Sequence, residues 1–277
     1  MTAAGTTELP VSPPPRPRGR GRKVATAWLV VGSIGAVVLL VVGPIAVTSL
    51  VAHEERTVHR SFAVDAVRTV DVDVDEGEVT VVGDAAGAVQ VDALISRGLR
   101  DTATTIDLQG DRLVVRAHCR GPLTEHCRMD VVVHVPPTVA VVGRTSDAPV
   151  QVRAIAGEVR IGTTDGDVGL ESLTGVVRVD NRDGSVTGTG LGAGPVRVDT
   201  RDGDVDVTFA VPPTGVSATT RDGAVSVVVP EGSGPYAVSA TSGDGDVSTP
   251  VRTDPTSERA VHAASRDGDV AVRYPGT

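Results

Sequence analysis

Hydrophobic and polar residues alternate over residues 62–142, and this alternation predicts β-strands with one buried face. Val70, Val72 and Val74 alternate with three aspartates, so a period of two places all three valines on one side of a strand. The same alternation recurs in Val79 and Val81, in Val89, Val91, Ala93 and Ile95, in Ile106 and Leu108, in Leu113, Val115 and Ala117, and in Met129, Val131, Val133 and Val135. Turn residues separate these runs, as at Gln109-Gly110-Asp111, so we expect antiparallel hairpins throughout this region.

A repeat replaces simple alternation in residues 143–277. A phrase with an Asp-Gly turn, followed two residues later by a valine, occurs six times, and its glycines are 18, 19, 20, 22 and 23 residues apart. The turns are Asp165-Gly166, Asp183-Gly184, Asp202-Gly203, Asp222-Gly223, Asp244-Gly245 and Asp267-Gly268, and the valines are Val168, Val186, Val205, Val225, Val247 and Val270. A near-constant period of this size is typical of a solenoid whose coils cover one another. We therefore expect an all-β fold in which a β-solenoid follows the hairpins.

The repeat has a second, weaker signal between successive turns. Gly157-Glu158-Val159 and Gly175-Val176-Val177 lie about nine residues from the flanking turns, which is enough for a strand of about five residues and a turn. Each coil should therefore hold two or more strands. Hydrophobic residues make up 40% of the chain but aromatic residues only 2%, so we expect a core of thin layers of stacked valine and alanine.

Stacked coils should bring the charged turn residues into rows. We expect the glycines to supply a positive φ, and the turn aspartates before them to form one ladder, offset by a row of arginines at Arg182, Arg201, Arg221 and Arg266. A second ladder would hold Asp167, Asp204, Asp246 and Asp269. Calcium could bridge this second ladder because it takes six to eight oxygen ligands, but turn chemistry balanced by arginine is the favoured interpretation, with no metal.

The N-terminal 51 residues predict a membrane anchor. Residues 1–23 form a Pro-rich and Arg-rich tail that we expect to be disordered, and residues 24–51 contain no charged side chain. A helix of that length can span a bilayer core of about 30 Å. Five basic residues precede it and two glutamates follow, so we expect a cytoplasmic N-terminus, a juxtamembrane linker at 52–61 and an extracellular remainder in a single-pass protein of the cell membrane. A cleaved signal peptide is the alternative.

Two cysteines, Cys119 and Cys127, flank a Gly-Pro turn between predicted strands. In an exported domain they should form a disulfide that closes the hairpin. The neighbouring His118 and His126 raise the alternative of a zinc site. Adjacent side chains on a strand point to opposite faces, however, so a histidine and its neighbouring cysteine could not easily reach one ion.

The net charge of the chain restricts the kinds of molecule that it can bind. Without the five basic residues of the tail and Glu8, the chain carries 21 basic against 34 acidic residues, a formal net charge of −13. Nucleic acid is therefore a poor partner. Catalysis is also disfavoured, because the repeated turn carboxylates are equivalent, whereas acid–base catalysis needs two carboxyl groups in unlike environments.

The predicted anchor, the hairpin with its two cysteines leading into Val131-Val132-Val133-His134-Val135-Pro136-Pro137, and the Asp-Gly-x-Val phrases together resemble a known family. They are similar to the bacterial "putative adhesin" family of β-strand-repeat proteins, a domain of unknown function. The resemblance covers roughly residues 62–272 and implies an extracytoplasmic β-solenoid without catalytic residues or cofactor. We expect a non-enzymatic module that binds another envelope or surface protein. A sensor of envelope state that works through a partner is the alternative, and a polysaccharide-acting solenoid enzyme is a third, disfavoured one.

Overall fold

The computed structural model describes residues 54–84, 87–97, 103–118, 128–232 and 234–277. The predicted tail at 1–23, the predicted helix at 24–51 and the predicted Cys119–Cys127 disulfide lie outside these residues. The residues from Ala52 to Thr277 form one compact unit. Its only helix among the described residues is the three-residue 3-10 turn η1 (Val64–Ala66), and no helix in the described ranges has the length and hydrophobicity needed to cross a membrane.

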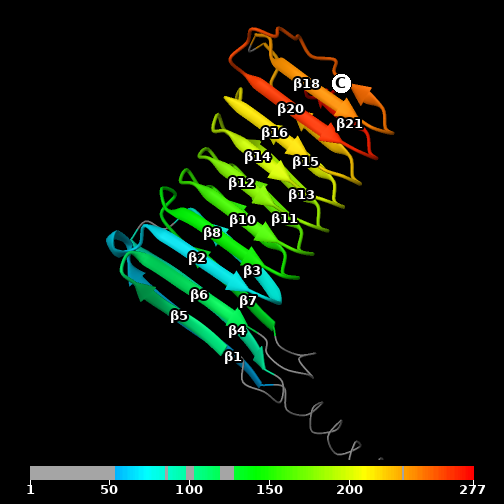
Figure 1. Cartoon of the computed structure of the whole chain (residues 1–277). Coiled ribbons are helices and arrows are strands. Elements are labelled where there is room, and N and C mark those ends of the chain that lie inside the picture. Colours follow the sequence, from blue (N-terminus) through cyan, green and yellow to red (C-terminus); the bar gives the residue numbers. More distant parts are fainter. Residues whose placement is uncertain (1–53, 85–86, 98–102, 119–127, 233) are drawn as a thin grey trace, which may run out of the picture. The chain divides into compact units, whose positions relative to one another are not determined.

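Two long β-sheets make up this unit (Figure 1). The first sheet has 11 strands in the order β1 (Glu54–Ala63), β4 (Ala88–Arg97), β7 (Arg128–His134), β3 (Gly77–Val82), β9 (Val150–Arg153), β11 (Val168–Glu171), β13 (Val186–Leu191), β15 (Val205–Phe209), β17 (Val225–Val228), β21 (Val270–Arg273) and β19 (Val247–Ser248). The second sheet has 10 strands in the order β18 (Ala237–Ser242), β20 (Ala260–Ser265), β16 (Gly215–Thr219), β14 (Val196–Asp199), β12 (Val177–Asp180), β10 (Val159–Thr163), β8 (Ala140–Thr145), β2 (Thr69–Val74), β6 (Arg112–His118) and β5 (Ala103–Gln109). Successive strands of the repeat alternate between the sheets, so one coil contributes one strand to each sheet.

The valines of neighbouring coils stack in register because the repeat strands are parallel. In the first sheet Val168 pairs with Val150 and Val186, and in the second Val177 pairs with Val159 and Val196. These inward-facing side chains join one hydrophobic core that consists mostly of valine, with alanine, a few leucines and few aromatic residues. The predicted second strand in each coil and the predicted thin aliphatic layers agree with this structure.

The region 62–142 differs from the predicted series of antiparallel hairpins. β2 is parallel to β6 and β8, and β3 is parallel to β7 and β9, so β2 and β3 already form a first coil. The turn at Gly77 passes from one sheet to the other instead of reversing the chain within a sheet. Among the predicted hairpins, β5 and β6 do pair antiparallel around Gly110, whose φ is 65°. Alternation reports which face of a strand is buried but not which strand lies beside it, and this is why the prediction was wrong here.

Two predicted boundaries also move. The predicted solenoid start at residue 143 falls inside β8, and the predicted linker at 52–61 contains most of β1, which pairs antiparallel with β4. The solenoid and the region before it therefore share the same two sheets.

The last coils do not stack in sequence order. β21 pairs with β17 on one side and with β19 on the other, and β20 likewise lies between β16 and β18 (Figure 1). The final coil of the chain, β20 and β21, thus lies between the coil of β16 and β17 and the coil of β18 and β19. The stacking order follows the sequence from β8 to β17 and departs from it beyond β17.

Candidate functional site

The repeat turns lie where the strands of the second sheet end and the chain crosses to the first. Each turn rests on its neighbour through the backbone: the N–H of Asp183 donates to the carbonyl of Thr164 (2.8 Å), and the N–H of Asp202 donates to the carbonyl of Arg182 (2.8 Å). Asp222, Asp267 and Asp244 continue the same pattern, in that spatial order. The six predicted turns therefore form one continuous side of the stack.

The repeat glycines are needed for close stacking and not for a positive φ. None of the six has a φ in the left-handed region, which corrects the expectation drawn from the sequence. A Cβ at Gly203 would lie 2.0 Å from the carbonyl oxygen of Gly184, and a Cβ at Gly223 would lie 2.2 Å from that of Gly203. Glycine is required because each turn packs directly on the backbone of the next.

A row of polar side chains, which the sequence reasoning missed, lines the inside of these turns. Three residues before each glycine stands a hydroxyl or amide residue: Thr163, Asn181, Thr200, Thr220, Ser242 and Ser265. Ser265 shows its function, because its Oγ donates to the carbonyl of Gly223 (2.7 Å) and accepts from the N–H of Gly268 (3.0 Å). The side chain thus satisfies backbone groups of two coils at once. The signal was available in the sequence, since these residue types are the ones that cap turns.

The first aspartate ladder brings neighbouring carboxyl groups within interaction distance. A hydrogen bond with Asp222 raises the pKa of Asp202, and a hydrogen bond with Asp183 raises the pKa of Asp165, each assisted by the like charge of its neighbours. Asp222 shows the opposite effect, because hydrogen bonds from Asp267 and Asp202, with the nearby Arg221 and Arg266, lower its pKa. Neighbouring carboxyl groups of the ladder therefore influence one another's pKa values. It also includes Asp147, which interacts with Asp165 and was not predicted.

The second ladder, proposed from the sequence as the alternative calcium site, caps backbone groups. A carboxylate oxygen of Asp167 accepts from the N–H of Ser185 (2.9 Å), that of Asp204 from the N–H of Ala224 (2.8 Å), and that of Asp269 from the N–H of Asp246 (2.9 Å). Ser185 and Ala224 occupy the equivalent position in alternate coils, which separates Asp167 from Asp204 and Asp204 from Asp269. Among the residues that the structure describes, this ladder does not supply the three converging ligand groups that a metal ion needs.

The four arginines of the repeat line a shallow open groove of about 580 Å³ at the ends of the second-sheet strands. Arg182, Arg201, Arg221 and Arg266 are all exposed and follow one another without interruption, because the N–H of Arg201, Arg221 and Arg266 donates in turn to the carbonyl of Arg182, Arg201 and Arg221 (3.0, 3.0 and 3.1 Å). Gly243 interrupts the row in the sequence but lies outside it in space, because the last coil is inserted before it. We call this feature the arginine groove.

The arginine groove is only partly neutralised. Within the described part of the chain, none of its four guanidinium groups lies within ion-pair distance of a carboxylate, whereas other arginines are paired, as in Arg178 with Glu158 (2.7 Å) and Arg197 with Asp199 (2.7 Å). The charges of Arg221 and Arg266 help to lower the pKa of Asp222 without forming an ion pair with it. The predicted balance between the arginine row and the aspartate ladder is therefore present but weak. The groove therefore presents unpaired positive charge on an otherwise acidic protein.

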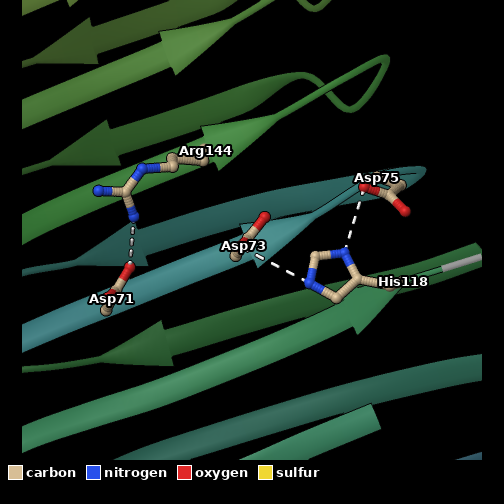
Figure 2. Close-up of polar contacts among 5 residues, drawn as sticks. All are labelled: Asp71, Asp73, Asp75, His118 and Arg144. Atoms are coloured by element: carbon tan, nitrogen blue, oxygen red, sulfur yellow. Dashed lines mark hydrogen bonds and ion pairs between the residues drawn. The ribbon is translucent and has the colours of Figure 1, made fainter. Parts of the chain in front are cut away.

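A second polar group lies on the outer face of β2 (Figure 2). Asp71 is 3% exposed and binds two guanidinium groups, Arg112 (2.8 Å) and Arg144 (3.1 Å), so it is not on a hydrated face as the alternation predicted. The two arginines come from the strands on either side of β2 and cover the carboxylate. Asp73 and Asp75 continue along the same face toward His118.

Several solved structures and one family model are similar to this chain. Three solved structures resemble the chain: a "putative cell adhesion protein" from Clostridium sporogenes (8% identity, 80% of this chain and 100% of that chain, TM-score 0.34), a "putative adhesin" from Bacteroides fragilis (12%, 79% and 97%, 0.36) and a "putative lipid binding protein" from Parabacteroides distasonis (10%, 80% and 96%, 0.37). None of the curated proteins matches. The family described as Toastrack DUF4097 matches residues 67–273, which confirms the resemblance seen in the sequence. This chain belongs to the Toastrack DUF4097 family.

Proposed function

We propose that this chain is a non-enzymatic binding module of the cell surface, and that its arginine groove takes the acidic groups of an extended partner. The observation that supports this function is the row of four exposed guanidinium groups without an ion-pair partner among the described residues. A guanidinium group binds carboxylate or phosphate through two parallel hydrogen bonds, so an unpaired one is a ready anion site.

The regular geometry favours a linear ligand. Neighbouring coils are about 4.8 Å apart, so the four arginines present positive charge at a constant interval along the groove. The chain beyond the tail is acidic overall, with a formal net charge of −13 that includes the four groove arginines, and it would repel a wide polyanion. A narrow acidic chain that follows the groove would contact the four guanidinium groups and only two lining carboxylates, Asp180 and Asp199.

The proposed location at the cell surface rests on residues 24–51. Their lack of charged side chains and the five basic residues before them support a single-pass anchor with an extracellular repeat. The partner would then be an acidic envelope polymer, or an acidic segment of an envelope or surface protein.

Binding of the full-length chain in detergent micelles to labelled polyglutamate and polyphosphate tests the groove. The Arg201→Gln/Arg221→Gln variant should bind at least about tenfold more weakly, because each charge-assisted hydrogen bond contributes about 1.5–3 kcal/mol. The matched control, Arg153→Gln/Arg160→Gln, removes the same charge from arginines that are already paired with Glu171 (3.3 Å) and Glu158 (2.8 Å). Equal weakening in both variants would show that only net charge matters and would refute the groove.

Cross-linking mass spectrometry on intact cells identifies what carries the acidic groups. Links to other cells or secreted material that disappear in the groove variant support a binding module. A discrete set of links to one membrane protein of the same cell supports the sensor alternative. Replacing residues 24–51 with an unrelated membrane helix should abolish the function of a sensor and leave that of a binding module intact.

A further inference from the structure

Three side chains converge at the end of β2, away from the arginine groove (Figure 2). Asp73 lies on β2, Asp75 directly follows it, and His118 is the last residue of the parallel strand β6. The N–H of Asp75 donates to the carbonyl of Ala117 (3.1 Å), which places His118 beside Asp75. Because side chains alternate along a strand, Asp73 lies on the same face as Asp75. The parallel pairing of β2 with β6 therefore brings one imidazole between two carboxylates.

Ligand atoms of these three residues lie close enough to one another to reach a single ion. His118 Nε2 lies 3.6 Å from Asp73 Oδ2, and its Nδ1 lies 3.4 Å from Asp75 Oδ1. A normal hydrogen bond between these atoms is about 2.7–3.2 Å long. Two ligand atoms bound tetrahedrally to one zinc ion are about 3.4 Å apart, given bond lengths of about 2.0–2.2 Å. Each ring nitrogen therefore lies near that spacing from one carboxylate, and one ion can bind only one of the two nitrogens. One atom from each of the three residues lies within 4.8 Å of the other two.

His118 differs in this respect from the other described histidines. His134 Nδ1 forms an ordinary contact of 2.8 Å with a single carboxylate, Asp84, and His59 likewise contacts only Asp92. The three side chains of the group are each about 30% exposed, so they are accessible yet held by the surrounding strands. Arg112 and Arg144 bind Asp71, and Arg116, which is paired in register with Asp73, forms no ion pair with Asp73 among the described residues.

We propose that Asp73, Asp75 and His118 form a binding site for a borderline divalent cation such as Zn²⁺. One imidazole and two carboxylates are a ligand set that such ions accept, whereas Ca²⁺ requires six to eight oxygen ligands. Three protein ligands leave a coordination position open for water or for a group from a partner. This site does not depend on the function proposed for the arginine groove.

Zinc titration calorimetry of the full-length chain, without a histidine tag and in detergent micelles, tests the site. The titration is run in a Cys119→Ser/Cys127→Ser background, so that thiols cannot supply the ligands. One zinc ion should bind per chain, and His118→Gln or Asp73→Asn should weaken binding at least tenfold. The matched controls His134→Gln and Asp84→Asn, which change a histidine–carboxylate pair with one partner, should bind as the parent does.

A second measurement needs no substitution. In the unmodified chain, zinc should shift the ring nitrogen resonances of His118 in an NMR spectrum and leave those of His134 and His262 in place. Absence of that shift overturns the proposal, as does zinc binding that survives in His118→Gln. Binding that disappears with the cysteines but persists in Asp73→Asn would assign the ion to the thiols instead.

Discussion

Val270 lies in register beside Val225 and separates it from Val247, although Val247 comes first along the chain. The last coil is therefore an interior layer of the stack, and β18 and β19 have it as their only pairing partner among the described strands. Val270 is 1% exposed, whereas Val247 at the end of the stack is 47% exposed. Equivalent positions in the repeat thus differ in how much each contributes to stability.

Substitution of Val270 and Val247 by alanine should separate these contributions. Val270→Ala removes buried methyl groups and leaves a cavity, so the free energy of unfolding should fall by about 1.5–3 kcal/mol. Val247→Ala is the matched control and should change it by less than about 0.5 kcal/mol, as surface substitutions do. Denaturant unfolding measures both values. Hydrogen exchange should also show lost protection at 237–248 in Val270→Ala, and equal effects of the two variants would contradict the inserted order.

Gly223→Ala should destabilise the stack because of close backbone packing. The added Cβ would lie 2.2 Å from the carbonyl oxygen of Gly203, so neighbouring coils must separate, at about 1–3 kcal/mol for overpacking. Gly215→Ala is the control, since a Cβ there meets nothing within 4 Å and its φ is not positive. That variant should be neutral or slightly stabilising. Thermal melting compares the two, and an unchanged melting temperature in Gly223→Ala would refute the stacking role.

Ser265→Ala should test the inner polar row. The substitution removes the acceptor for the N–H of Gly268 and the donor to the carbonyl of Gly223, in a side chain that is 8% exposed. Leaving buried backbone groups without partners costs about 1–3 kcal/mol, and the melting temperature should fall accordingly. The exposed Ser239 on β18 provides the control, because Ser239→Ala should leave the melting temperature unchanged.

The first aspartate ladder should make stability depend on pH in a defined direction. The pKa values of Asp165, Asp202 and Asp267 are raised, chiefly by hydrogen bonds with neighbouring aspartates, so the folded state holds protons that the unfolded state has released. Their contribution to stability therefore falls as pH rises from the ordinary aspartate pKa of about 3.9 through the raised values. The lowered pKa of Asp222 acts oppositely, because its contribution is present above the ordinary value and is lost as pH falls.

Asp202→Asn should remove part of this dependence, since an amide can donate to Asp222 without taking up a proton. The variant should melt at a higher temperature than the parent at pH 7, and the difference should shrink toward pH 4 and at high salt. Asp206→Asn is the control, because Asp206 lies on β15 opposite Thr187 and Ser226. A difference that grows toward low pH would contradict proton sharing in the ladder.

Much of this architecture was predictable because it follows from the regular spacing of residue types over short stretches of sequence. The spacing of the valines and the Asp-Gly turns predicted an all-β stack with two or more strands in each coil, and the scarcity of aromatic residues predicted its thin core. The row of hydroxyl and amide residues before each glycine carried an equally regular signal. A side-chain period specifies which face is buried and where the chain turns, since these depend only on positions close together in sequence.

Which strands lie side by side depended on the tertiary structure. Backbone hydrogen bonds between parallel strands form with almost any side chains, so alternation at Val70–Val74 could not distinguish a hairpin from a coil. Insertion of the last coil placed Arg266 directly after Arg221 in the arginine groove, and the pairing of β6 with β2 placed His118 between Asp73 and Asp75. Sequence by itself thus determined the repeating unit and its turns, whereas packing between distant segments decided the order of the coils and therefore which charged residues meet.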